Sequence, residues 1–178
     1  YRSLDPFVKN AITLLADIRE RKHIQGIIAK AIESNEIAAI ESALEEAKKS
    51  TASGLQVDIN AANEKLTQRK LEEQLKANLA EAVATLDVAK IEAAITKAKN
   101  AKLQALTSAI NEAQEKLQGI QKQIQESKAE LKKAVESKIT SDLSAAIDKC
   151  GSSALVASFN AELMAAKDLL KKQQDLLA

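Results

Sequence analysis

The chain has 178 residues, 46% of them hydrophobic but only 2% aromatic, and its 26 basic and 25 acidic side chains leave a net charge of +1. This near balance argues against the strong overall field that attracts nucleic acids or anionic membrane surfaces. With four glycines, one proline and an excess of strong helix formers, a β-rich fold is excluded, and we predict an all-α protein.

Helical signals predict about seven helices that alternate between long and short. Asp5 and Pro6 begin the first helix, because proline at the first helical position loses no hydrogen bond. This helix is expected to end near residue 33. The six that follow are expected at about 36–50, 55–84, 87–101, 103–136, 140–150 and 154–177.

Three hydroxyl residues mark the starts of the short helices. Ser34, Thr85 and Ser137 each precede an apolar periodic run, so each is a candidate N-cap whose side chain accepts a backbone N–H bond. Glu36 and Asp87 follow two of them, where a carboxylate suits the positive end of the helix dipole.

The sequence repeats itself at a step of 51 residues. Residues 28–66 placed on 79–117 without a gap give 15 identities in 39 pairs, and a third copy follows at a step of 52. Such self-similarity is typical of arrays in which each unit buries its apolar face against its neighbours. We expect repeat units at about 28–78, 79–130 and 131–178, with 1–27 as the leading part of the first long helix.

The apolar stripe of each long helix changes face halfway along. Between Leu66 and Leu71, for example, a five-residue step turns the stripe by about 140°. One half of the helix would then pack on the preceding short helix and the other half on the following one. The expected fold is an elongated array of overlapping three-helix bundles joined by continuous helices.

This linkage resembles that of spectrin repeats, in which a continuous helix joins adjacent three-helix bundles. The 51-residue step is far too short for that family and the sequence has no tryptophan. The resemblance therefore covers the linkage and not family membership.

The two residues best suited to chemistry have structural interpretations. His23, the only histidine, aligns with Gln74 in the repeat, so its position is a polar one on a helix. Cys150, the only cysteine, aligns with Ala47 and Ala98, which indicates a small packing position and an unreactive thiol. We expect no catalytic, cofactor-binding or metal-binding residue, no cofactor and no enzyme activity.

Charged side chains are mixed along the helices. The acidic pairs Glu45-Glu46 and Glu72-Glu73, and Glu41 beside Lys48, are expected on solvated faces. Basic residues gather at 19–23, 97–102 and 128–138, but acidic residues interleave most of them and no aromatic lies nearby to stack on a base. We expect protein partners or flanking domains of the same chain, and no nucleic acid.

The lone cysteine excludes an internal disulfide framework and fits a reducing compartment. No run approaches the roughly 20 apolar residues of a membrane span, and no signal peptide opens the chain. We expect a cytoplasmic location, and because the chain opens on Tyr1 we expect it to be part of a longer protein.

The predicted function is that of a non-enzymatic spacer, lever or scaffold within a larger cytoskeletal or motor-associated protein, monomeric in isolation. One alternative is a helical adaptor that binds a partner's amphipathic helix, which would leave an exposed apolar patch on the order of several hundred Å². Another is a coiled-coil oligomerisation segment, because near-heptad apolar residues run from Leu103 to Val135. Against the coiled coil, the short helices carry apolar stripes that would cover this seam from within the chain.

Overall fold

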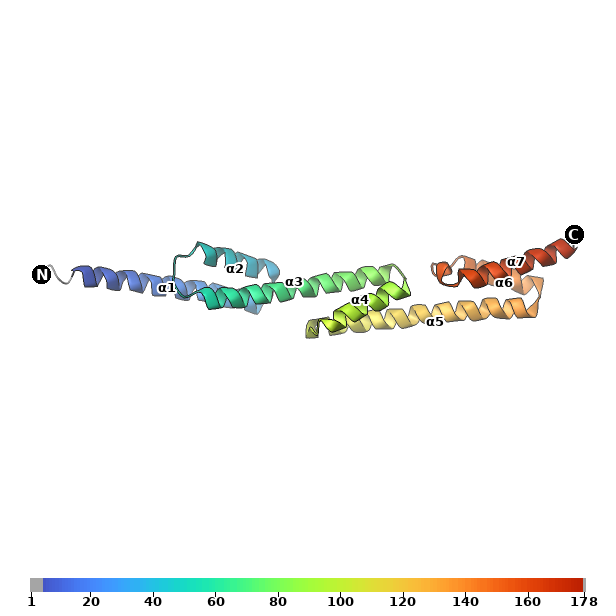
Figure 1. Cartoon of the computed structure of the whole chain (residues 1–178), viewed down its shortest axis with the longest axis horizontal. Coiled ribbons are helices and arrows are strands. Elements are labelled where there is room, and N and C mark those ends of the chain that lie inside the picture. The colour runs from blue at the N-terminus through green and yellow to red at the C-terminus, as the bar shows by residue number, and fades with distance from the viewer. Residues whose placement is uncertain (1–4, 178) are drawn as a thin grey trace. The chain divides into compact units, whose positions relative to one another are not determined.

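The computed structural model describes residues 5–177, which form seven α-helices and two 3₁₀ helices without any strand (Figure 1). The prediction of an all-α fold with seven helices is confirmed. The α-helices are α1 (Asp5–Ser34), α2 (Ile37–Lys49), α3 (Gln56–Ala84), α4 (Val88–Asn100), α5 (Thr107–Ser137), α6 (Thr140–Gly151) and α7 (Asn160–Leu177). The 3₁₀ helices η1 (Gln104–Leu106) and η2 (Val156–Phe159) lead into α5 and α7. Within the described range, no helix is long and apolar enough to cross a membrane.

The three hydroxyl residues predicted as N-caps lie at the ends of long helices instead. The side chains of Ser34, Thr85 and Ser137 donate to the carbonyl oxygen three residues earlier, at 2.8, 2.7 and 3.0 Å. Each also accepts, at 3.3 Å, from the backbone N–H two residues later. The N-cap prediction is therefore wrong by two residues, since the caps are Glu36, Asp87 and Ile139.

A left-handed residue separates each hydroxyl from the cap that follows. These residues are Asn35, Leu86 and Lys138, with φ of 63°, 56° and 54°. Asparagine tolerates this conformation, whereas for leucine it costs about 1–2 kcal/mol. Because the chain reverses at this residue, the hydroxyl completes the long helix and cannot start the short one.

Contacts divide the chain into two compact units, one ending at Gln74 and the other beginning at Leu75. In the first unit, α2 packs along the second half of α1, and the first half of α3 contributes to the same core. The buried residues of this core are Ile24, Ile28, Ala31, Ile40, Ala43, Leu44, Ala47, Leu55 and Ala62. Polar contacts join the same helices, because Gln25 Nε2 donates to Asp58 Oδ2 at 2.8 Å and Lys70 Nζ lies 2.7 Å from Glu41 Oε1.

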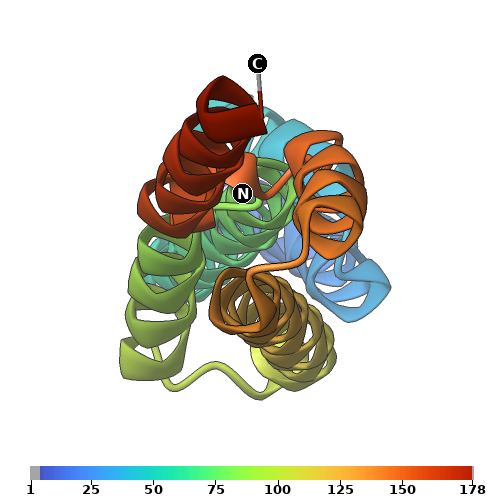
Figure 2. The same cartoon turned by 90° about the vertical axis from the view of Figure 1, so that its right-hand side faces the viewer.

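In the second unit, the last part of α3 and the helices α4 to α7 share one core. Figure 2 looks along α5, α6 and α7 and shows these three helices at the corners of a triangle. Their buried side chains include Leu131 in α5, Leu143 in α6, and Phe159 before α7. The near-heptad stripe of α5 lies in this core, since Leu106, Ile110, Ala113, Ile120 and Leu131 are buried and Leu103, Leu117, Ile124 and Val135 are partly buried against it.

Charged residues interrupt the apolar stripe in the middle of α3. Glu72, predicted on a solvated face, is buried instead, with 3% of its surface exposed. Its partners explain the difference, because the Arg69 guanidinium forms an ion pair with it and Gln68 Nε2 donates to it at 3.2 Å. Arg69 Nε also donates to the carbonyl oxygen of Asn35 at 3.0 Å, which ties α3 to the turn between α1 and α2.

Candidate functional site

The only histidine, His23, lies exposed on α1. The two residues at the same position of the repeat, Gln74 and Gln125, are exposed as well. Among the described residues, no three His, Cys, Asp or Glu side chains come together in a way that could hold a metal ion. His23 therefore occupies a solvated helix position, as the glutamines at the same position of the repeat do.

Cys150 is a core residue of the second unit, with 2% of its surface exposed. Its Sγ donates a weak hydrogen bond to the carbonyl oxygen of Ser127, 3.9 Å away on α5. Burial raises the pKa of the Cys150 thiol, and the nearby Glu130 carboxylate adds to this. Since the thiolate is the nucleophilic form, these surroundings disfavour it, and the burial of Cys150 agrees with the packing position that its repeat alignment predicts.

Two of the carboxylates predicted on solvated faces, Glu41 and Glu45, form exposed ion pairs, although the partner of Glu41 is not the predicted one. Glu41 pairs with Lys70 of α3 rather than with Lys48, because α3 brings a lysine across to it. Lys48 pairs instead with Glu45, at 3.0 Å, and this contact holds the pKa of Glu45 below its usual range. Exposed pairs of this kind contribute little to stability.

Two lysines of the basic group at 128–138 have acidic partners. Lys128 Nζ lies 2.9 Å from Glu162 Oε1 of α7, and Lys132 Nζ lies 3.9 Å from Glu136 Oε1. Exposed Lys149, on α6, pairs with Glu130 at 2.7 Å. These pairs place acidic side chains beside basic ones and reduce the positive field along α5.

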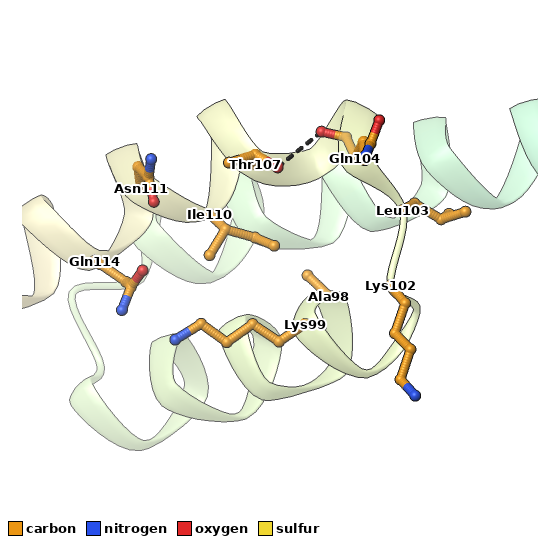
Figure 3. Close-up of a pocket in the computed structure, with 9 residues that line it drawn as sticks. All are labelled: Ala98, Lys99, Lys102, Leu103, Gln104, Thr107, Ile110, Asn111 and Gln114. Carbon is orange, nitrogen blue, oxygen red and sulfur yellow. Dashed lines mark hydrogen bonds between the residues drawn. The ribbon is translucent and has the colours of Figure 1, made fainter.

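A shallow depression of about 330 Å³ lies where α4 leads into α5 (Figure 3). Its lining includes the side chains of Lys99, Ile110 and Gln114, and the Lys102 side chain points away from it. The hydrogen bond drawn there is local, from Thr107 Oγ1 to the carbonyl oxygen of Gln104 at 2.8 Å. The lining residues come from the end of α4, the connection and the start of α5. No carboxylate is among them, so the lining does not bring together an acid, a base and a nucleophile.

Two further grooves lie between successive long helices of the second unit. The groove between α3 and α5 measures about 320 Å³ and includes Leu79 and Val83. The groove between α5 and α7 measures about 460 Å³ and includes Leu131 and Val135, which hold the same positions one repeat later. Both are mainly apolar, and the second is bordered by the Lys128–Glu162 pair.

Among the residues that the structure describes, the largest group of exposed large hydrophobic side chains belongs to the first half of α1. Five large side chains there are between 53% and 73% exposed: Phe7, Val8, Ile12, Leu14 and Leu15. At 100° per residue they lie within an arc of about 160°, which also includes Ala11 and Ile18. We call this set of seven residues the α1 face. The other exposed large hydrophobic residues of the described chain are scattered singly, which is normal for a protein surface.

The sequence analysis missed the α1 face, although the signal was present in the repeat. Val8, Ala11 and Leu15 align with residues that the expected array buries. No protein-family model, no curated protein and no solved structure matches the chain. The molecule's own cores and surfaces are therefore the basis for a functional proposal.

Proposed function

We propose that the chain is a non-enzymatic helical spacer or scaffold, built as an array of overlapping three-helix bundles. One observation carries the proposal: α3 is a single helix from Gln56 to Ala84 that contributes to two different cores. Ala62 is buried in the core of the first unit, whereas Leu75 and Leu79 are buried in the core of the second. A helix shared in this way resists bending more than a flexible linker does.

The burial pattern of the short helices supports a repeating array. The same four positions are filled by Ile40, Ala43, Leu44 and Ala47 in α2, by Ile91, Ala94, Ile95 and Ala98 in α4, and by Leu143, Ala146, Ile147 and Cys150 in α6. All are buried except Ala94, which is partly buried. Each short helix therefore presents one narrow apolar stripe of small and aliphatic side chains to its long neighbours.

In this proposal the chain sets a distance or transmits an orientation between flanking parts of a larger cytoplasmic protein, and it acts as a monomer. Residues 67–74 of α3 contain neither proline nor glycine and consist mainly of strong helix formers, which favours an unbroken linker. The comparison with cytoskeletal and motor-associated rods is one of architecture alone.

Proline at Gln68 tests the proposal, with Gln68→Ala as the matched control. Proline removes one helical hydrogen bond and clashes with the preceding turn, at about 3 kcal/mol, while both cores keep their side chains. We expect small-angle X-ray scattering to show a changed maximum dimension or greater flexibility for Gln68→Pro, with helix content nearly unchanged by circular dichroism. Unaltered scattering would contradict the lever, as would a parent radius of gyration near the roughly 16 Å of a globular chain of this length.

A second candidate function is that of a helix-binding adaptor, favoured by the apolar groove between α5 and α7. Its lining residues Leu131 and Val135 and its border of Lys128 and Glu162 suit an amphipathic helix with charged flanks. Binding of such a helix that Val135→Glu abolishes would support the adaptor. The coiled-coil alternative has less support, because the α5 stripe is packed within the second unit.

A further inference from the structure

We infer that the α1 face is a docking site for a further repeat unit of the kind this chain contains, namely the second half of a long helix together with a short amphipathic helix. The inference concerns an interaction surface and goes beyond the spacer function, because a spacer needs no uncovered apolar face.

The repeat identifies three residues of the α1 face as core positions that lack a partner. Val8, Ala11 and Leu15 recur as Ile59, Ala62 and Leu66 in α3, as Ile110, Ala113 and Leu117 in α5, and as Leu163, Ala166 and Leu170 in α7. The last step is 53 residues because η2 is one residue longer than η1. All nine later residues are buried in a core or packed against one, whereas Val8 and Leu15 are each 53% exposed.

The helices that pack on the later copies of Val8, Ala11 and Leu15 indicate which kind of helix would pack on the first copy. α4 packs on α5 and α6 packs on α7, while α2 shares a core with the first half of α3. Each covering helix carries an aliphatic residue, an alanine, a second aliphatic residue and a small residue at positions i, i+3, i+4 and i+7, as Ile40, Ala43, Leu44 and Ala47 do. A unit with this pattern matches the spacing of Val8, Ala11 and Leu15.

The charges beside the face favour a protein over a membrane surface. Residues 5–20 contain three acidic and two basic side chains, whereas helices that lie on anionic membranes are rich in lysine and arginine on their polar face. The polar side of α1 also makes protein contacts, because Asp17 Oδ1 accepts from the backbone N–H of Ser53 at 2.9 Å and Oδ2 accepts from Ser53 Oγ at 2.9 Å. The α1 face points away from these contacts on the helical wheel.

Two neighbouring leucines give a matched test of this occupant. Leu14 and Leu15 are 60% and 53% exposed, so lysine at either position leaves the existing cores intact. The position of Leu15 holds leucine in α3, α5 and α7, whereas that of Leu14 holds lysine in two of the three, as Lys65 and Lys116. A docked repeat unit therefore requires Leu15 and tolerates lysine in place of Leu14.

The experiment joins a second copy of residues 20–51 directly ahead of Tyr1 in the full chain. In the natural order residue 52 follows residue 51, and residue 52 aligns with Tyr1, so the fusion keeps the repeat in register. Hydrogen exchange is measured at the amides of residues 8–18, with the α4 and α6 amides as the folding control. We expect exchange at residues 8–18 to slow by about tenfold or more on fusion, to return nearly to the unfused rate with Leu15→Lys, and to stay slow with Leu14→Lys.

Three results would overturn the inference. The first is exchange that fusion does not slow, and the second is an equal loss of protection in the Leu14→Lys and Leu15→Lys fusions. The third is protection of the same amides in the unfused chain by a second copy at raised protein concentration, or by vesicles with anionic lipid, because either would name a different occupant.

Discussion

The middles of α3 and α5 occupy the same position in the 51-residue repeat but carry different side chains. Arg69 and Glu73 stand in α3 where Ile120 and Ile124 stand in α5. In α5, Ile120 is buried and Ile124 packs beside it, so a single core runs along this helix from one side of its middle to the other. The apolar pair is thus part of one continuous core within the second unit.

The polar pair in α3 has the opposite effect. The core of the first unit ends along α3 at Leu66, and the core of the second begins at Leu75. Between them lies the ion pair of Arg69 with buried Glu72. The comparison leads us to expect that the two side chains at this position of the repeat decide whether the core continues along a long helix.

The largest expected effect comes from placing the α3 residue in α5. Ile120→Arg puts a charge at a position that is 7% exposed, and we expect a loss of roughly 3–5 kcal/mol in the free energy of unfolding. The unfolding transition of this variant in denaturant, followed by circular dichroism, should also broaden or split into two. The exposed neighbour Gln123→Arg is the control, expected to stay within about 0.5 kcal/mol, and equal effects of the two variants would mean that Ile120 does not join the bundles.

Placing the α5 residue in α3 is expected to reduce the free energy of unfolding by a somewhat smaller amount. Arg69→Ile leaves the buried carboxylate of Glu72 without its ion pair but with the hydrogen bond from Gln68, at a loss of roughly 2–3 kcal/mol. Adding Glu72→Gln, the residue that α5 carries as Gln123, removes the buried charge and should restore most of the loss. The two variants are compared by urea unfolding, and a harmless single substitution would show that the ion pair does not govern this region.

Gly119 offers a smaller change within the middle of α5. A Cβ added there meets no heavy atom within 4 Å, and the residue lies inside a helix. Gly119→Ala should therefore raise the free energy of unfolding by about 0.5–1 kcal/mol, because alanine loses less backbone entropy on folding. A thermal melt that shifts downward would indicate that the glycine is needed for packing.

The smallest effect concerns the cross-helix pair of the α5–α7 contact. The hydrogen bond from Lys128 holds the pKa of Glu162 below its usual range, so the charged carboxylate favours the folded state. That contribution is complete above the unfolded pKa, near 4.5, and is lost as the pH falls through the lower folded pKa. The residue of α5 at the same repeat position as Glu162 is Ala109, so the contact between α3 and α5 lacks a carboxylate there.

Glu162→Gln should therefore lower the urea midpoint slightly at pH 7 and leave it close to that of the parent chain at pH 3. The midpoints of the two proteins are compared at both pH values. A difference that is the same at pH 3 as at pH 7 would show that the Glu162 carboxylate does not contribute through its charge.

Sequence patterns predict the helices well where the apolar period is strong. The bounds of α2 and α4 differ from expectation by one residue at each end, because apolar residues recur there at every turn. The turns are predicted less well, since the left-handed conformations of Leu86 and Lys138 follow from the chain reversal and not from any preference of these residues. Propensity alone therefore misplaces the caps by two residues.

The burial of Glu72 and the exposure of the α1 face were also beyond the sequence analysis, for different reasons. Glu72 is buried because Arg69 folds onto it and also reaches Asn35, a contact between residues far apart in the chain. Val8 and Leu15 are exposed although their repeat counterparts lie in or against a core, because an apolar pattern predicts burial without identifying the surface that provides it.

Native-state hydrogen exchange of the full chain in low denaturant is the most direct test of the claim that the middle of α3 separates two cores while the middle of α5 joins two bundles. We predict that core amides of α4, α5 and α6 exchange through one shared opening, and that those of the α1 second half and α2 exchange through another, with a different free energy. A single opening for all these helices would contradict the account, as would separate openings for α4 and α6.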